Sequence, residues 1–306
     1  MDNGMLLVSP APHVRSKTNT QKIMLDVIIA MTPALIASTI IFGWRALLIV
    51  AVCVASCVLF EFLFQKLCKR DVTVGDLSAV VTGMLLALNL PVSIPIWQAV
   101  FGCLVAIVAV KQLFGGIGKN FANPAITARI VMLISFAGTM TNFSTVADTT
   151  SSATPLSQIG TDAMPSLLDL FLGNHGGSLG ETCALALIIG FVYLLVRRVI
   201  TWHTPVVFVG TVALFTLCLG QNPLEHVLSG GLLLGAIFMA TDYSTTPSTK
   251  WGKVIFGLGC GIITVLIRVF GGYPEGVSFA ILLMNILTPY ISRLTRRKIF
   301  GGVKKK

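Results

Sequence analysis

A run of hydroxyl side chains between residues 148 and 154 is the first feature of the sequence that could carry chemistry. The run reads Asp148-Thr-Thr-Ser-Ser-Ala-Thr154, and Pro155 follows it. A proline disfavours helix at the residue before it, so the sequence predicts a polar loop that ends in a turn. Because small residues flank the hydroxyls, a bulky group could reach them. An ordinary Ser/Thr-rich loop would have the same composition, and the residues alone leave both interpretations open.

Acidic side chains at breaks between apolar segments are the second such feature. Asp76 precedes one apolar segment as a plausible helix N-cap, Asp242 follows another in a polar break, and Glu275 opens a third. A charge at the centre of a bilayer costs at least ~2.5 kcal/mol, so residues of this kind usually face a cavity, form an ion pair or act in function. A cation path and a cofactor pocket would both use such breaks.

Three further charges lie within or near apolar segments. Arg129 falls inside one of them, where it either forms a salt bridge or binds an anionic group. Asp26 and Glu61 lie near segment ends, where they either stay hydrated at the membrane interface or face a cavity. The sequence does not decide between these alternatives.

Histidine and cysteine patterns do not predict a metal centre. The four histidines lie in loops or at segment ends, and none of the seven cysteines forms a C-x-x-C pair. Zinc and iron–sulfur sites use clustered ligands, and a bis-histidine haem needs two facing imidazoles at membrane depth. The sequence also contains no Ser-His-Asp arrangement and no phosphate-binding glycine loop.

The composition identifies the class of protein. Of the 306 residues, 55% are hydrophobic and 11% are charged, and the mean hydropathy is +0.87. A soluble domain carries about 25% charged residues, so the composition excludes a cytosolic enzyme, a nucleic-acid-binding protein and a disordered chain. The net charge of +10 is explained by basic loops that face the cytoplasm. The first 22 residues lack an apolar stretch, so we expect no cleavable signal peptide.

Apolar segments of sufficient length to cross a bilayer recur along the chain. We expect an all-α integral membrane protein with ten transmembrane helices. Those of the first half span residues 23–42, 45–67, 77–90, 94–114 and 124–138. Those of the second half span residues 181–199, 204–220, 227–241, 254–270 and 276–292. The third, fifth, eighth and tenth are short, and proline or glycine interrupts or bounds them.

The distribution of basic residues predicts the orientation. Most of the 22 lysines and arginines fall on one side of the predicted bundle, together with both termini, and this side is predicted to be cytoplasmic. Residues 139–180 contain no lysine or arginine, so this loop is predicted to be extracytoplasmic. The predicted organisation is a cytoplasmic N-terminal segment (1–22), a five-helix unit (23–138), the loop (139–180), a second five-helix unit (181–292) and a basic cytoplasmic tail (293–306).

The two five-helix units resemble each other. Trp44 corresponds to Trp202, Pro91 to Pro247, and the pair Gly115-Gly116 to Gly271-Gly272, in the same order along both halves. An odd number of spans in each unit gives the two units opposite orientations. This is the inverted-repeat organisation of many transporters, whose short or broken helices mark a site near the membrane midplane.

Several motifs together resemble a known family. They are Ser9-Pro-Ala-Pro-His-Val-Arg15, Gly75-Asp-Leu-Ser-Ala-Val-Val-Thr-Gly83, Gly118-Lys-Asn-Phe-Ala-Asn-Pro-Ala125, Phe238-Met-Ala-Thr-Asp242 and Gly272-Tyr-Pro-Glu-Gly276. Across nearly the whole chain, the sequence resembles the D subunit of the Rnf electron-transport complex and, more distantly, the B subunit of the sodium-pumping NADH:quinone reductase. The resemblance therefore implies a redox-linked membrane subunit.

The resemblance also gives a role to the hydroxyl run. The family's flavinylation motif resembles D-x-x-S-G-A-T, which Asp148, Ser151, Ser152, Ala153 and Thr154 match, with Ser152 in place of the glycine. The match implies that Thr154 carries FMN through a phosphoester bond. Serine restricts the backbone more than glycine does, so Ser152 is a departure from the pattern. A noncovalent riboflavin near the membrane-embedded region is implied as well.

The expected function follows from these resemblances. The chain would be a subunit of an ion-translocating ferredoxin:NAD⁺ oxidoreductase of the cell membrane, active only within its complex, that relays electrons and couples them to Na⁺ or H⁺ transport. Its expected partners are the A, B, C, E and G subunits of the Rnf complex, a flavin transferase and membrane lipid, with no nucleic acid. Asp76, Asp242 and Glu275 are candidates for the ion path. The competing hypotheses are a solute channel or secondary transporter without a redox cofactor, and a passive scaffold for redox partners.

Overall fold

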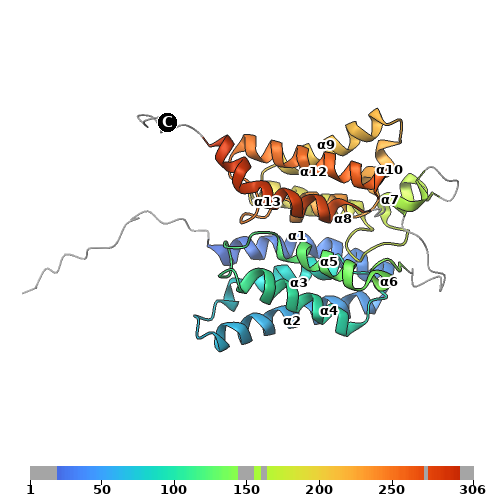
Figure 1. Cartoon of the computed structure of the whole chain (residues 1–306). Helices are drawn as coiled ribbons and strands as arrows, with labels where there is room; N and C mark the ends of the chain where they lie inside the picture. Colours follow the sequence, from blue (N-terminus) through green and yellow to red (C-terminus); the bar gives the residue numbers. More distant parts are fainter. Residues whose placement is uncertain (1–18, 144–154, 160–163, 272–274, 297–306) are drawn as a thin grey trace, which may run out of the picture.

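The structure is a computed structural model that describes residues 19–143, 155–159, 164–271 and 275–296. These residues form helices joined by loops, and no extended strand occurs among them (Figure 1). The prediction of an all-helical protein is thus confirmed for the part of the chain that is described. The predicted flavin-attachment residues, Asp148 and 151–154, lie outside the described residues.

The first half of the chain contains two long helices followed by shorter ones. Its elements are α1 (Thr20–Phe42), α2 (Trp44–Leu67), η1 (Val74–Asp76), α3 (Ser78–Leu88), α4 (Ile96–Leu104), the π-helical η2 (Val105–Gln112), α5 (Pro124–Ser135) and α6 (Ala137–Met140). Gly43, with φ of +75°, separates α1 from α2 and allows the chain to reverse there. Both α1 and α2 are long and apolar enough to cross a membrane.

The second half has short helices first and long helices last. Its elements are η3 (Pro155–Gln158), α7 (Leu167–Leu172), α8 (Ala184–Val196), α9 (His203–Cys218), α10 (Pro223–Leu228), α11 (Leu232–Leu234), the π-helical η4 (Gly235–Met239), α12 (Lys250–Phe270) and α13 (Val277–Thr295). Length and composition again make two of them, α12 and α13, candidate membrane spans. Helices α3, α5, α8 and α9 are apolar but shorter.

Each of the ten apolar segments expected from the sequence contains helix, but the fifth breaks at Phe136 between α5 and α6, and the eighth is not continuous either. Residues 227–241 are divided among α10, α11 and η4, because the chain breaks at Ser229-Gly230-Gly231, where Gly230 has φ of +66°. Helix α5 begins as predicted, with the Asn123 side chain accepting hydrogen bonds from the N–H groups of Ala125 and Ile126. Helix α3 begins at Ser78, and Asp76 Oδ1 accepts from the Ser78 N–H at 2.8 Å.

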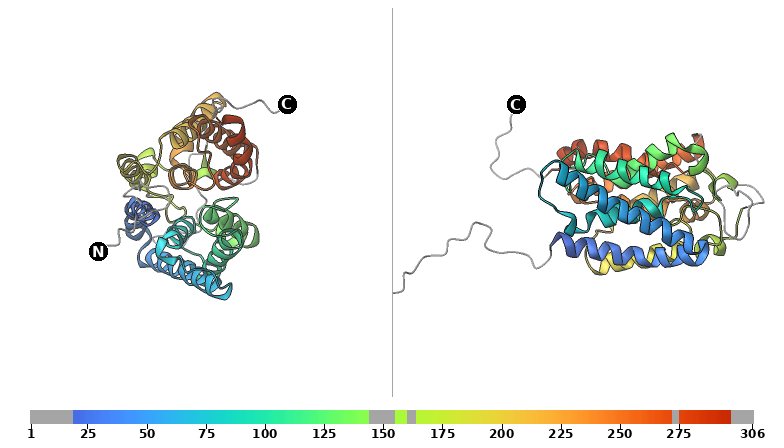
Figure 2. Two further views of the ribbon diagram at one scale, coloured as in Figure 1. Left: turned by 90° about the vertical axis from the view of Figure 1, so that its left-hand side faces the viewer. Right: turned by 90° about the horizontal axis from the view of Figure 1, so that it is seen from below.

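The helices form two groups on either side of a seam (Figure 2, left). One group contains α2 to α5, and the other contains α9, α12 and α13, while α1 and α8 pack against each other at the seam. Helices α5 and α13 also meet across it. We call the end of the bundle that carries α6, α7 and α10 the α7/α10 end (right in Figure 1). At the opposite end, α2 and α8 end and α12 begins, and we call it the basic end because Lys66, Arg197 and Lys250 lie at these helix ends.

The α1–α8 contact depends on a glycine. A Cβ on Gly190 of α8 would collide with the carbonyl oxygen of Ala30 in α1 and lie 3.0 Å from the Phe238 ring. Overpacking of this kind costs about 1–3 kcal/mol. We therefore expect Gly190→Ala to lower the thermal midpoint of the purified chain in detergent. Gly210→Ala is the matched control, because nothing lies within 4 Å of a Cβ at Gly210 in α9. Equal midpoints for the two variants would contradict the packing argument.

Candidate functional site

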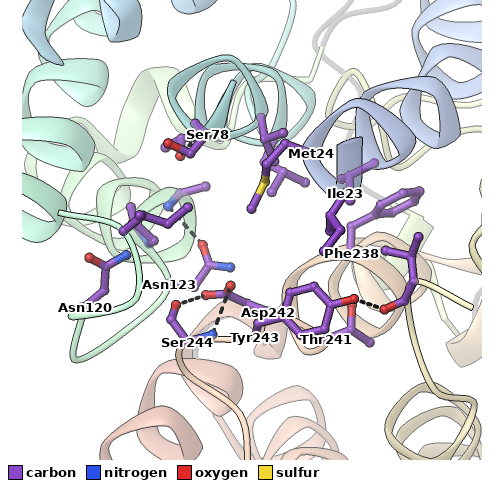
Figure 3. Close-up of a pocket in the computed structure, with 18 of the residues that line it drawn as sticks. Ile23, Met24, Ser78, Asn120, Asn123, Phe238, Thr241, Asp242, Tyr243 and Ser244 are labelled. Carbon is purple, nitrogen blue, oxygen red and sulfur yellow. Dashed lines mark hydrogen bonds between the residues drawn. The ribbon is translucent and has the colours of Figure 1, made fainter. Parts of the chain in front are cut away.

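A pocket lies between the two groups of helices (Figure 3). Its apolar wall includes Ile23 of α1, Leu85 of α3 and Phe238 of η4, whereas Asn123 and Asp242 belong to its polar wall. Its volume of about 100 Å³ is enough for several water molecules. Residues of both halves of the chain line the pocket, so it lies at the interface between the two halves.

Asp242 is the carboxylate in this pocket. Its Oδ2 accepts hydrogen bonds from the hydroxyls of Ser244 at 2.9 Å and Thr245 at 3.0 Å. Among the residues that the structure describes, no lysine or arginine forms a salt bridge with it. A carboxylate surrounded by hydroxyls, beside a polar pocket, offers the oxygen ligands that Na⁺ and other hard cations accept. The same carboxylate could also accept a proton.

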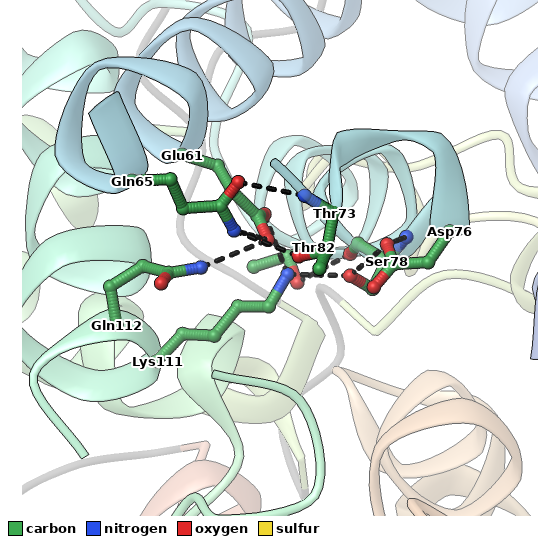
Figure 4. A network of polar contacts seen from close by, with 8 residues as sticks. All are labelled: Glu61, Gln65, Thr73, Asp76, Ser78, Thr82, Lys111 and Gln112. Atoms are coloured by element: carbon green, nitrogen blue, oxygen red, sulfur yellow. Dashed lines mark hydrogen bonds and ion pairs between the residues drawn. The ribbon is translucent and has the colours of Figure 1, made fainter. Parts of the chain in front are cut away.

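A second polar cluster lies inside the first group of helices, among α2, η1, α3 and η2 (Figure 4). Lys111 Nζ forms a salt bridge with Glu61 Oε2 at 2.6 Å, and the two side chains are 2% and 1% exposed. The other carboxylate oxygen of Glu61 accepts from Gln112 at 2.9 Å and from Gln65 at 3.3 Å. The buried charges are therefore paired and hydrogen-bonded, as a low-dielectric environment demands.

This cluster is connected to the pocket through Ser78. Lys111 Nζ donates to Ser78 Oγ at 2.6 Å, and Ser78 in turn donates to Asp76 Oδ1 at 2.6 Å. Ser78 and Lys111 also line the pocket that contains Asp242. Two of the three acidic residues predicted for an ion path, Asp76 and Asp242, thus belong to one connected polar region.

The third, Glu275, lies in a different cluster. Its carboxylate forms an ion pair with Arg129 of α5, and Arg129 also pairs with Glu181 Oε1 at 2.8 Å. Arg129 Nη1 donates to Asn89 Oδ1 at 2.6 Å. For Arg129, the salt bridge is therefore the correct one of the two alternatives. Glu275 is not among the residues that line the pocket between the halves.

The structure also decides the environment of Asp26 and Glu61. Asp26 pairs with Arg197, whose side chain is 55% exposed, so this contact lies at the bundle surface. Glu61 is buried instead of hydrated. Sequence reasoning counted Lys111 among the basic residues of the cytoplasmic side and did not single out Glu181, although the position of Lys111 within the predicted segment 94–114 was a usable signal for a buried cation.

Comparisons with known proteins find similarity over nearly the whole chain. A family model described as the NQR2, RnfD, RnfE family matches residues 7–301. The D subunit of the Na⁺-translocating ferredoxin:NAD⁺ oxidoreductase complex of Acetobacterium woodii is 50% identical over 98% of this chain and 96% of its own length. The D subunit of the proton-translocating ferredoxin:NAD⁺ oxidoreductase complex of Clostridium ljungdahlii is 38% identical over 96% of both chains. The D subunit of an ion-translocating oxidoreductase complex of Stutzerimonas stutzeri is 38% identical over 93% of both.

Proposed function

Because this chain belongs to the NQR2, RnfD, RnfE family, we propose that it is the D subunit of an ion-translocating ferredoxin:NAD⁺ oxidoreductase complex. The observation that carries this proposal is the 50% identity, over nearly the full length of both chains, to a protein with that name. The chain contributes to the oxidoreductase as one subunit of the complex. The transported ion is Na⁺ or H⁺, the two ions named for its relatives.

We propose ten membrane spans arranged as two inverted five-helix repeats in the cell membrane, with both termini in the cytoplasm. Four helices are long enough to cross a membrane, and helical structure within each of the six other predicted segments supports the count. The two groups of helices on either side of the seam support the division into repeats (Figure 2). The concentration of lysine and arginine at the basic end supports its cytoplasmic placement.

Thr154 is the proposed attachment site of FMN, through a phosphoester bond to its hydroxyl. The proposal rests on the motif from Asp148 to Thr154 and on its location in a segment without lysine or arginine, which the charge distribution assigns to the extracytoplasmic side. When bound, FMN supplies electron transfer, and the protein supplies its position and electrostatic environment. A phosphoester link leaves the isoalloxazine ring free for that role.

We propose that the chain also binds a noncovalent riboflavin near its membrane-embedded region, as the family resemblance implies. This proposal has its own measurement, which is the amount of riboflavin released when the purified chain is denatured. That amount should be unchanged in Thr154→Ala, which lacks the covalent site.

Asp76 and Asp242 remain the proposed members of the ion path, since both belong to the polar region around the pocket. Glu275 remains a weaker candidate, because Arg129 already pairs with its carboxylate. The sequence contains no recognisable nicotinamide or ferredoxin site, so we assign those to the A, B, C, E and G subunits as partners. A flavin transferase is the expected partner for the attachment step.

A channel or transporter without a cofactor is the alternative hypothesis, since the same helix arrangement would serve it. It gives no role to residues 148–154, whereas the redox proposal does. The deciding experiment co-expresses the complex with its flavin transferase and views this chain under ultraviolet light on a denaturing gel. We expect a fluorescent band that is lost completely in Thr154→Ala.

The matched control is Thr150→Ala, which removes a hydroxyl from the same loop at a position that the motif leaves variable. It should retain the fluorescent band. A dark wild-type band, or a band that persists in Thr154→Ala, would refute covalent attachment at this residue and would favour the channel or the scaffold.

A further inference from the structure

The pocket that contains Asp242 has an open end and a closed end (Figure 3). Among the residues that line it, Ile117 and Tyr243 are 42% and 58% exposed, whereas Leu85 and Phe238 are 5% and 6% exposed. The exposed pair lies in the loops that precede α5 and α12, and the buried pair lies inside α3 and η4. Since α12 begins at the basic end and α5 leads from there to α6, the pocket opens at the basic end and closes in the interior of the bundle.

The ion cluster around Arg129 lies directly beyond the closed end. Leu85 of α3 and Ala125 of α5 line the pocket, and Asn89 and Arg129 follow them four residues further along. Four helical residues advance about 6 Å along the axis. Arg129 Nη1 donates to Asn89 Oδ1 at 2.6 Å, so the two positions meet there. The guanidinium is therefore about one helical turn from the pocket, on the side of the α7/α10 end.

Arg129 joins the two halves of the chain at this level. It is 4% exposed, and it pairs with Glu181 Oε1 at 2.8 Å and with the carboxylate of Glu275. A Cβ on Gly231 would lie 2.6 Å from Glu181 Oε1 and 3.3 Å from Arg129 Nη1, so a side chain at position 231 would push this ion pair apart. The guanidinium and its two carboxylates thus occupy the seam between the halves, directly beyond the pocket.

Polar groups continue on the far side of Arg129, toward the α7/α10 end. Arg268 of α12 donates to the backbone carbonyls of His226, Ser229 and Glu275. Both ring nitrogens of His226 and the hydroxyl of Ser229 are buried without hydrogen-bond partners among the described residues. Buried polar groups are normally satisfied, and water is the usual partner where the protein offers none. Arg129 therefore has a polar pocket on one side and unpartnered polar groups on the other.

From this arrangement we infer that Arg129 is the barrier of the proposed ion path, so that a cation moving between Asp242 and the α7/α10 end must displace its guanidinium. The inference rests on the function proposed above, with Asp242 as a member of the path. A fixed positive charge in a low-dielectric seam strongly repels a small cation that approaches it. Its ion pairs with Glu181 and Glu275 hold the guanidinium in that position.

A barrier of this kind would keep ion movement dependent on electron transfer, because a path open at both ends would let the ion gradient dissipate. When the guanidinium moves away, Glu181 and Glu275 lose their positive partner, and the passing cation can take its place. The positive charge of Arg129 provides the barrier, whereas its planar fork provides the packing between the halves. Substitutions can separate these two properties, since lysine keeps the charge but lacks the fork.

The first test is passive ²²Na⁺ flux through the whole complex in proteoliposomes, without an electron donor. Arg129→Gln should raise this flux by about tenfold or more, which corresponds to a barrier lowered by about 1.4 kcal/mol or more. Arg129→Lys should lower the thermal midpoint but keep the flux near the wild-type value. Arg197→Gln is the matched control, since Arg197 also pairs with a carboxylate of the other half, Asp26, but its side chain is 55% exposed. Its flux should equal that of the wild type.

A wild-type flux in Arg129→Gln would overturn the inference. A flux that rises equally in Arg129→Lys would also overturn it, because lost packing rather than lost charge would then open the path. Adding Asp242→Asn to Arg129→Gln should suppress the leak. If the leak persisted in this double variant, the ions would bypass Asp242, and the proposed ion path would fail together with the inference.

A second measurement keeps Arg129 in place. Leu85→Cys puts a thiol at the closed end of the pocket, and a small positively charged methanethiosulfonate reagent is applied to one face of the membrane, with a thiol quencher on the other. Mass spectrometry of the peptide around position 85 separates its labelling from that of the native cysteines. We expect labelling from the basic face only, and from both faces after Arg129→Gln is added. Labelling of the single variant from the α7/α10 face, or none from the basic face, would contradict the inference.

Discussion

Replacing Lys111 with methionine is expected to destabilise the protein by about 3–5 kcal/mol, because it leaves the carboxylate of Glu61 buried without its cation. The two side chains are 2% and 1% exposed, so water cannot replace the lost ammonium group without opening the helix packing. Ser78 would lose a hydrogen-bond donor in the same change. The measurement is reversible unfolding of the purified chain in mixed micelles, followed by circular dichroism.

The double variant Lys111→Met with Glu61→Gln should recover most of that loss, because a neutral amide at position 61 removes the unpaired charge. Lys253→Met is the matched control, since Lys253 donates at the surface to Thr201 and makes no salt bridge among the described residues. If Lys111→Met and Lys253→Met were equally stable, the buried ion pair would contribute little to the stability of the protein. If the double variant were less stable than the single one, the unpaired charge would not be the cause.

The class of fold could be predicted from the sequence because membrane insertion imposes simple rules. Long apolar segments must be helical, since the bilayer offers no partner for free backbone groups. Helices α1, α2, α12 and α13 follow that rule directly. The start of α5 was also predictable, because Asn123 and Pro124 satisfy the local requirements of a helix N-terminus.

The sequence predicted that proline or glycine interrupts or bounds the eighth segment, but it did not predict where the helix breaks, because apolar content does not report backbone conformation. Leu232 and Leu234 continue the apolar run of residues 227–241, but Gly230 in a left-handed conformation ends α10 before them. That conformation makes room for Leu156, which is far away in the sequence. The break thus coincides with a tertiary contact, and such a contact cannot be predicted from the composition of one segment.

The same limit applies to the candidate site. Asp76 and Asp242 could be selected from the sequence because each is a charge at the edge of an apolar segment. The partner of Glu275 could not, because Arg129 lies on a different helix in the other half of the chain. Glu181 is a further example, since it follows a polar loop and its burial beside Arg129 appears only when the two halves are packed together.

The Asp242→Asn variant is expected to abolish ion movement by the complex while leaving the covalent flavin in place. The carboxylate has hydroxyl partners but no cation among the described residues, so its negative charge is free to attract Na⁺ or to accept a proton. An amide of the same size keeps the packing and removes that charge. The measurement is ²²Na⁺ uptake, or acidification if protons are carried, by inverted vesicles that contain the whole complex.

Glu275→Gln is the informative comparison, because Glu275 is held by Arg129. Removing its charge should act chiefly by weakening the buried ion cluster, which lowers stability, whereas Asp242→Asn should abolish transport at unchanged stability. The fluorescent flavin band serves as the control that both variants are assembled. Full ion uptake in Asp242→Asn would remove this carboxylate from the path. In that case the hydrogen-bonded connection from Ser78 through Lys111 to Glu61 would have a structural role in the buried cluster and no role in ion transport.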